Sequence, residues 1–250
     1  MIAPWSSQAQ EGFRIETDIN VEGYEQPVSR TLSLFRDGAI YDMSRDEGQD
    51  ITLIEPSLDR ITRFNEATKT KTHNSISELK KLIPAAEQQA AQGPLAIFLA
   101  GAQSIQVTKE KIVVGREPLR YEATLQKPLD ADNAGFYVQL YQQFADASKL
   151  LNSFSTGGDP PFARLALNKA LAKQGAIPKE IKLYAKRGGK EIVYSSRLHV
   201  NWGLSKYDKE RITKIQDMLA NFEQVTPAEY NRRVQAALVP QTQQPTAVNR

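Results

Sequence analysis

The sequence contains no cysteine and only two histidines among its 250 residues. Without cysteine the chain cannot form disulfides or use thiolate chemistry, and with so few nitrogen ligands a structural zinc site is not expected. No run of about 18 apolar residues is present, so we expect no transmembrane segment. The net charge of +3 is too small to indicate nucleic-acid binding, and we expect none.

Motifs for catalysis and for phosphate binding are missing as well. The two glycine pairs, at 157–158 and 188–189, lack the spacing of phosphate-binding loops and are typical of turns. Ser195 and His199 share one face of an expected strand, but no acid accompanies them and no Gly-x-Ser-x-Gly elbow exists. We therefore predict no enzymatic activity and no cofactor, and we keep a hydrolase that uses His199 as an alternative.

What the sequence does contain is a clear hairpin around Asp37-Gly38. Asp-Gly between two β-prone runs favours a type I′ turn, whose two central residues both have positive φ. A two-residue turn fixes the register, so that Leu34 faces Tyr41 and Phe35 faces Ile40. The face predicted as core carries Leu32, Leu34, Tyr41 and Met43. The other face carries Thr31, Ser33 and Asp42, with Phe35 and Ile40 near the turn.

A second hairpin is predicted from Asp50 to Asn65, with its turn at 56–59. In this register Ile54 faces Ile61 on the nominal outer face. Both hairpins therefore carry one apolar pair on that face, and the four residues are Phe35, Ile40, Ile54 and Ile61. Either helices cover these side chains, or they line a cleft that binds a hydrophobic or lipid-like ligand.

The remaining patterns predict an α+β fold with one curved antiparallel sheet, an incomplete barrel, packed with several helices. The sheet is expected from residues 12–73 and 103–126, extended or flanked by 180–202. The helices are expected at 75–92, 132–154, 160–175, 205–222 and 226–238. Residues 11–238 form the expected single domain, mostly sheet over 11–126 and mostly helices plus a hairpin over 127–238. Residues 239–250 are predicted to be a disordered tail.

Two further groups of residues have alternative interpretations. An aromatic stripe on the 132–154 helix, which includes Tyr137, Tyr141 and Phe144, has the spacing of core packing rather than of a ligand site. The acidic cluster Asp42, Asp46, Glu47 and Asp50 lacks the pattern of a calcium loop. It is interpreted as a solvated loop, with a weak cation site as the alternative.

Charge is distributed unevenly along the chain. Residues 1–160 hold 16 Lys/Arg and 22 Asp/Glu, whereas residues 161–214 hold 13 Lys/Arg and 4 Asp/Glu. The two parts can attract one another, or the basic segment 161–214 can contact an anionic partner or surface. The basic residues near the 188–189 turn that would make this contact are Lys182, Lys186, Arg187 and Lys190. A solvated edge that blocks aggregation explains the same residues.

The first hairpin and the strand-turn-strand from Ile51 to Thr62 resemble the bacterial envelope proteins built like the periplasmic lipoprotein carrier. That resemblance implies an incomplete barrel closed by helices, with an acyl chain between them. The stretch Asp159-Pro160-Pro161-Phe162 and its continuation look instead like part of exported bacterial proteins of unassigned role. No binding residue is carried over from either resemblance.

We thus expect a non-enzymatic envelope protein that binds a hydrophobic or lipid-like ligand. The alternative is an interaction module that meets an anionic partner through 161–214. Ser7-Gln8-Ala9 looks like the end of a signal peptide, so residues 1–10 are a possible leader remnant. If the true start lies upstream, the protein is expected to be periplasmic or otherwise exported. If Met1 is the true start, it is expected to be cytoplasmic.

Overall fold

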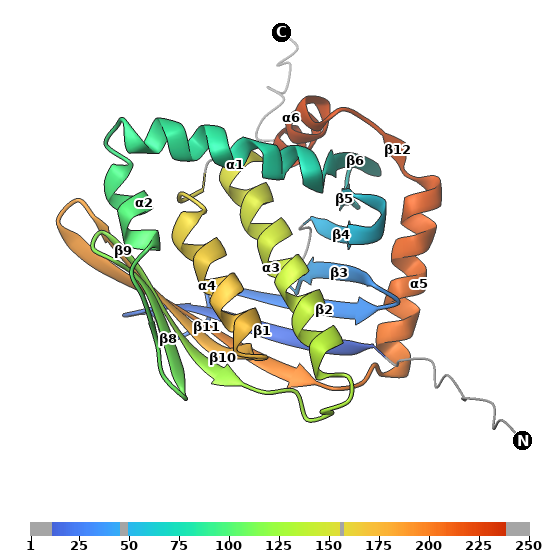
Figure 1. The fold of residues 1–250 in the computed structure, drawn as a ribbon. Coiled ribbons are helices and arrows are strands. Elements are labelled where there is room, and N and C mark those ends of the chain that lie inside the picture. The colour runs from blue at the N-terminus through green and yellow to red at the C-terminus, as the bar shows by residue number, and fades with distance from the viewer. Residues whose placement is uncertain (1–11, 46–49, 156–157, 239–250) are drawn as a thin grey trace, which may run out of the picture.

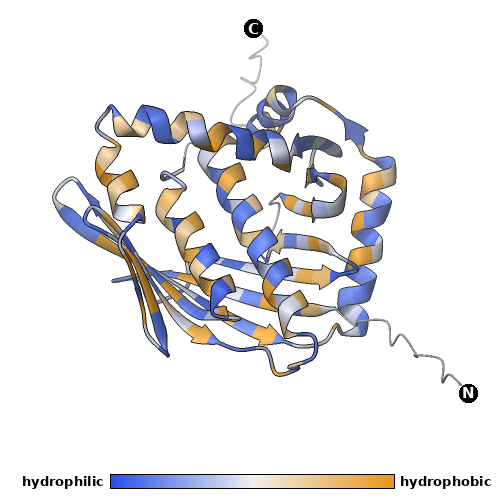
Figure 2. Ribbon diagram, viewed as in Figure 1, coloured by the Kyte–Doolittle hydropathy of each residue, from blue (hydrophilic) through white to orange (hydrophobic). Residues whose placement is uncertain are grey.

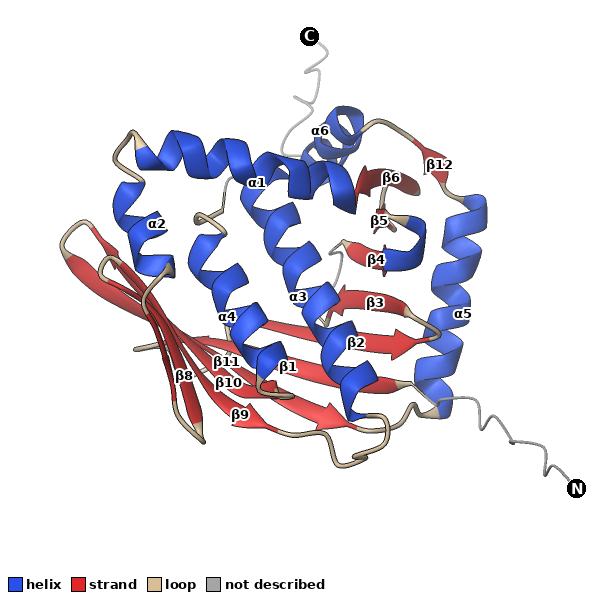
Figure 3. Cartoon of the chain, in the orientation of Figure 1, coloured by secondary structure: helices blue, strands red, loops and turns tan. Residues whose placement is uncertain are grey.

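The computed structural model describes residues 12–45, 50–155 and 158–238, so the expected leader remnant and tail lie outside the described residues. The described strands form one twelve-stranded sheet (Figure 3). In chain order they are β1 Phe13–Val21, β2 Ser29–Arg36, β3 Ala39–Ser44, β4 Ile51–Glu55, β5 Arg60–Asn65, β6 Thr70–Ser75, β7 Ile105–Val107, β8 Lys111–Arg116, β9 Leu119–Gln126, β10 Ile177–Arg187, β11 Lys190–Asn201 and β12 Glu223–Gln224.

The sheet runs in the order β12-β6-β5-β4-β3-β2-β1-β11-β10-β9-β8-β7. All neighbours are antiparallel except the short β12, which pairs parallel with β6. The sheet is curved and stays open, because β12 and β7 form two separate edges (Figure 1). The predicted α+β fold with a curved antiparallel sheet is confirmed.

The Asp37-Gly38 turn has the predicted geometry and register. Asp37 has φ 52° and Gly38 has φ 76°, which are the two positive values that a type I′ turn requires. Leu34 pairs with Tyr41 and Phe35 pairs with Ile40 in the ladder between β2 and β3. The Asp-Gly dipeptide therefore sets the register of the hairpin, and the register determines which side chains share a face.

We expect Gly38→Val to lower the free energy of unfolding by about 1–3 kcal/mol, because a β-branched residue at positive φ is strained. No atom lies within 4 Å of a Cβ built at Gly38, so a steric clash would not contribute. Gly38→Asn is the matched control, since asparagine tolerates this backbone conformation. Urea unfolding of the three proteins measures the effect. Equal stability of Gly38→Val and wild type would contradict the turn geometry.

Helices cover both faces of the sheet around this hairpin. Their bounds are α1 Ile76–Ala91, α2 Ala96–Ala102, α3 Ala134–Ser155, α4 Phe162–Lys173, α5 Lys206–Asn221 and α6 Pro227–Leu238. In Figure 1, α1 to α4 lie on the side of the sheet that faces the viewer. The short α2 lies outside the helix ranges expected from the sequence, and α1 runs through Pro84 as one helix.

The core consists of two layers, one on each side of the first strands. On one side, Leu34, Tyr41 and their neighbours pack against Ile212 and Ile215 of α5. On the other side, the strand residues whose side chains point the opposite way, such as Phe35 and Ile40, pack against α3, α4 and the start of α1. The face that the sequence predicted as core is therefore only one of two. The strands alternate in hydropathy (Figure 2), and on β2 to β5 both sets of side chains are largely buried.

The C-terminal hairpin β10–β11 joins the two halves of the sheet. β11 pairs with β1, and β10 pairs with β9, so residues 177–201 lie between the first strands and the 105–126 strands. This arrangement decides between the two predicted options, because the segment extends the sheet rather than flanking it. No helix in the described ranges is both long and apolar enough to cross a membrane.

Candidate functional site

A cleft of about 850 Å³ lies between the sheet and α3. Its floor comes from β1, β2, β3, β9, β10 and β11, and its roof from α3 and the segment 158–164. The size falls in the range of small-molecule sites in proteins. The apolar part of the lining comes from Ile19, Tyr121, Tyr141, Phe144, Ala145, Ile181, Leu183, Tyr194 and Leu198.

The cleft exists because small side chains replace large ones along the floor. At the start of β1, Phe13 and Ile15 are 0% and 1% exposed beneath the helices. Further along the same face of β1 the cleft is lined by Thr17, and on the paired strands by Thr31 and Ser196. These short side chains leave space that the core residues fill elsewhere.

One end of the cleft is polar and is organised around Asp159. The Lys149 ammonium and the Ser153 hydroxyl both donate to the backbone carbonyl of Asp159, each at 2.8 Å. The Arg187 guanidinium donates to both carboxylate oxygens of Asp159, at 2.9 and 3.0 Å. Burial lowers the pKa of Lys149 to about 8. These contacts connect α3, the segment before α4 and the end of β10 at one place.

A buried polar chain positions Arg164 at the same end. The Arg164 Nε donates to the Asn168 Oδ1 at 2.9 Å, and the Asn168 amide donates to the Asp146 Oδ1 at 2.8 Å. Asn168 is only 1% exposed, so its amide has no access to bulk water and depends on these partners. Burial raises the pKa of Asp146, and the hydrogen bond from Asn168 opposes that shift.

Asp42 lies at the floor of the cleft on β3. Its carboxylate accepts a hydrogen bond from the Ser33 hydroxyl at 2.6 Å. Burial raises the pKa of Asp42 to about 6, and the Ser33 hydrogen bond opposes part of that shift. Two tyrosines of the lining respond in the same way, since burial raises the pKa of Tyr121 to about 12 and also raises that of Tyr141.

The four predicted ligand residues do not line this cleft. Phe35, Ile40, Ile54 and Ile61 are each 0% exposed and belong to the core that faces α1, α3 and α4. Phe35 stacks on Phe13, with ring centroids 4.1 Å apart, and meets Phe144 edge-on at 5.6 Å. Of the two predicted alternatives, helix cover is the one that the structure has. The outer-face pairs are apolar because both faces of this part of the sheet are covered.

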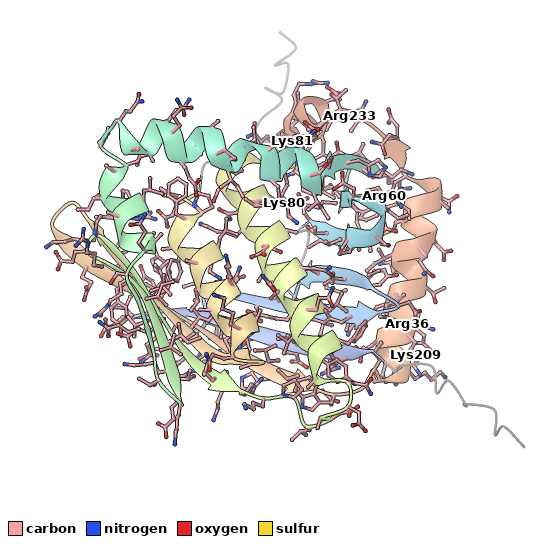
Figure 4. All side chains as sticks on the ribbon, viewed as in Figure 1. Arg36, Arg60, Lys80, Lys81, Lys209 and Arg233 are labelled. Carbon is pink, nitrogen blue, oxygen red and sulfur yellow. The ribbon has the colours of Figure 1, made fainter. Side chains whose placement is uncertain are left out.

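The predicted anion-contact residues separate, because strand residues alternate in direction. Arg187 lines the cleft, whereas Lys182 and Lys186 lie on the opposite face of β10 and Lys190 follows the turn. Lys186 pairs with Glu117 at 2.9 Å, and Lys182 lies opposite Glu122 in the ladder with β9. The six basic residues labelled in Figure 4 come from five other elements, β2, β5, α1, α5 and α6.

Of the remaining sequence candidates, Asp42 lines the cleft, whereas His199 and Asp50 do not. His199 is 67% exposed on the outer face of β11, where its Nε2 is 3.8 Å from Asp18. Asp46 and Glu47 of the acidic cluster lie outside the described residues. Asp42 belongs to strand β3 rather than to a solvated loop, and Asp50 accepts a hydrogen bond from Asn65. Among the described residues, no group of three or more histidine, aspartate or glutamate side chains could hold a metal ion.

Sequence reasoning missed Lys149, Arg164 and Asn168. A signal was present in α4, where Arg164 and Asn168 are four residues apart and therefore neighbours on one side of a helix. The aromatic stripe of α3 was correctly interpreted as packing for Tyr137, which is buried. Tyr141 and Phe144 of the same stripe also contribute to the lining of the cleft.

No family model and no curated protein matches this sequence. A solved structure of PNGF-II has a TM-score of 0.41 to this chain at 10% sequence identity. The match covers 91% of this chain and 33% of that one, so the chain spans about a third of the length of PNGF-II. A likeness at this level carries no functional argument, so a function can be proposed only from the geometry of the cleft.

Proposed function

We propose that this protein binds an amphiphilic, lipid-like ligand in the cleft between the sheet and α3, and that it does so without catalysis. The observation that carries the proposal is the combination of a volume of about 850 Å³ with a row of apolar side chains along the cleft and one charged end. The acyl chain implied by the resemblance to periplasmic lipoprotein carriers belongs to this ligand class.

The apolar lining supports a ligand with a hydrophobic part. Leu183, Tyr194 and Phe144 line the cleft and are only partly buried, although they pack against the core. An apolar ligand would remove their remaining surface from water, at roughly 25 cal/mol for each Å² covered. The short side chains of Thr17, Thr31 and Ser196 lie on the same floor and leave space between the sheet and α3.

Adjacent serines on β11 give a matched test. Ser196 lines the cleft between Ile19 and Ile181, whereas Ser195 points to the outer face and donates to Glu180 at 2.7 Å. We expect Ser196→Trp to weaken binding of the neutral dye Nile red by about tenfold or more, because the indole occupies the cleft. Ser195→Trp adds the same side chain to the same strand and should bind the dye as wild type does.

Fluorescence titration of the three proteins measures this difference, with thermal unfolding as the check that each is folded. Two results would overturn the proposal. One is the absence of saturable dye binding by the wild-type protein. The other is equal binding by both tryptophan variants, since the dye would then lie outside this cleft.

The alternative, an anionic partner on the segment 161–214, has less support from the described contacts. The outer face of β10 and β11 carries mixed charge, because Arg197 pairs with Glu180 at 3.3 Å and Lys186 pairs with Glu117. Exposed pairs of this kind neutralise one another at the surface. Among the described residues on this face, the basic side chains are interspersed with carboxylates and do not form a continuous basic patch.

A further inference from the structure

The residues that line the cleft include more cationic side chains than carboxylates. Three cationic side chains line the cleft, Lys149, Arg164 and Arg187, and two carboxylates, Asp42 and Asp159. Lys149 and Arg187 both contact Asp159, and the positive charge of Arg164 contributes to lowering the pKa of Lys149. The three cations come from α3, α4 and β10, so the fold brings them together from distant parts of the chain.

Arg164 is held in place but is not neutralised. Its Nε is occupied by Asn168, and a hydrogen bond with Arg164 opposes the rise that burial causes in the pKa of Tyr141. In the part of the chain that the structure describes, no carboxylate lies within ion-pair distance of Arg164; Asp146 acts on it from further away, by its charge and through Asn168. A guanidinium has five N–H donors, so this arrangement fixes the group and keeps donors for a further acceptor.

Lys149 is the second uncompensated cation. Its ammonium donates to a backbone carbonyl, which carries no formal charge. The charge of the Asp159 carboxylate opposes part of the lowering that burial causes in the pKa of Lys149, but both oxygens of this carboxylate are bound to Arg187. A partly buried ammonium without a carboxylate partner is costly, and an anion beside it would offset that cost.

We propose that Lys149 and Arg164, with Arg187 beside them, bind the anionic head group of an acidic amphiphile, a carboxylate or a phosphate, whose apolar part lies along Ile181 and Leu183. This inference deepens the proposed function and rests on it. Arginine matches the planar geometry of a carboxylate or a phosphate, and lysine supplies a point charge. The cleft is partly shielded from water, which strengthens both interactions relative to bulk solvent.

A pair of probes that differ only in the head group tests the charge requirement. cis-Parinaric acid carries a carboxylate and its methyl ester does not, while the fluorescent chain is the same. We expect wild-type protein to bind the acid about tenfold or more tightly than the ester, as is typical for hydrogen bonds to charged groups. If the protein binds neither probe, the proposed function fails. If it binds both equally, the ligand cleft stands and the head-group site is wrong.

Variants locate the head-group contact. Arg164→Met and Lys149→Gln should each lower the affinity for the acid by about fivefold to tenfold, and leave the affinity for the ester unchanged within about twofold. Arg120→Met is the matched control, because Arg120 lies over the ring of Tyr184 at 4.1 Å and is not part of the cleft lining. It should retain the wild-type ratio. A wild-type ratio in both cleft variants would overturn the assignment.

Two measurements complete the test. Because Arg164→Met also removes the partner of a buried amide, thermal unfolding establishes whether it is folded, and Lys149→Gln decides the outcome if it is not. Inorganic phosphate at about 10 mM distinguishes a lipid head group from a free anion, since a small anion lacks the chain that fills the apolar floor. We expect no displacement of the acid probe; complete displacement at constant ionic strength would indicate a site for a free anion and overturn the proposal.

Discussion

Replacing Phe35 by alanine should lower the free energy of unfolding by about 3–5 kcal/mol, as is usual for removing a buried phenyl ring. Phe35 is 0% exposed, stacked on Phe13 and in edge contact with Phe144 of α3. Its removal leaves a cavity between strands and helix that close-packed neighbours cannot fill without rearranging. Ile54→Ala removes a side chain that is also 0% exposed and should cost about 2–5 kcal/mol.

Ile19→Ala is the appropriate comparison for these core variants. Ile19 lies on the same face of β1 as Phe13 but lines the cleft and is only partly buried. We expect Ile19→Ala to lower the free energy of unfolding by only about 1 kcal/mol, because Ile19 buries less apolar surface in the folded protein than the core residues do. Urea unfolding of the three variants measures these losses. If Phe35→Ala proved as stable as wild type and lost dye binding, Phe35 would belong to a ligand site rather than to the core.

Asp42→Asn should raise the free energy of unfolding at pH 7 by about 1–3 kcal/mol, because one pKa unit corresponds to about 1.4 kcal/mol. Burial raises the pKa of Asp42 from its ordinary value near 3.8 to about 6, so the ionised carboxylate is disfavoured in the folded protein. Asparagine carries no charge, and its carbonyl oxygen can still accept the hydrogen bond from Ser33.

The sign follows from proton binding. Between about pH 4 and pH 6 the folded protein holds the Asp42 proton more tightly than the unfolded chain, so stability contributed by this group is present at low pH and falls as the pH rises through 6. The gain from Asp42→Asn should therefore be present at pH 7 and absent near pH 4. Denaturant unfolding at both pH values measures it. An equal gain at pH 4 and pH 7 would show that the carboxylate charge is not its cause.

Local chemistry explains the elements that could be predicted from sequence. The Asp37-Gly38 pair requires positive φ and so determines the turn, and the two-residue period then determines which side chains share a face. Ser205 and Asp208, which have the three-residue spacing of a capping box, form one at the start of α5. The pair Asp159-Pro160 is typical of an N-cap followed by the first residue of a helix, but Pro161 occupies the N-cap position of α4, and the Asp159 carboxylate binds Arg187 instead. A long-range ion pair competed successfully with a local cap.

The sequence by itself determined the strands, most of the helices and the register of both N-terminal hairpins, because each depends on residues close together in the chain. Only the tertiary structure decided that α1, α3 and α4 cover the face of the first strands opposite to α5, which makes Phe35 and Ile54 part of the core. It also decided the cleft, since Lys149, Arg164 and Arg187 meet only when β10–β11 inserts between β1 and β9. Contacts between distant segments leave no periodic trace in a single sequence, and the proposed site consists almost entirely of such contacts.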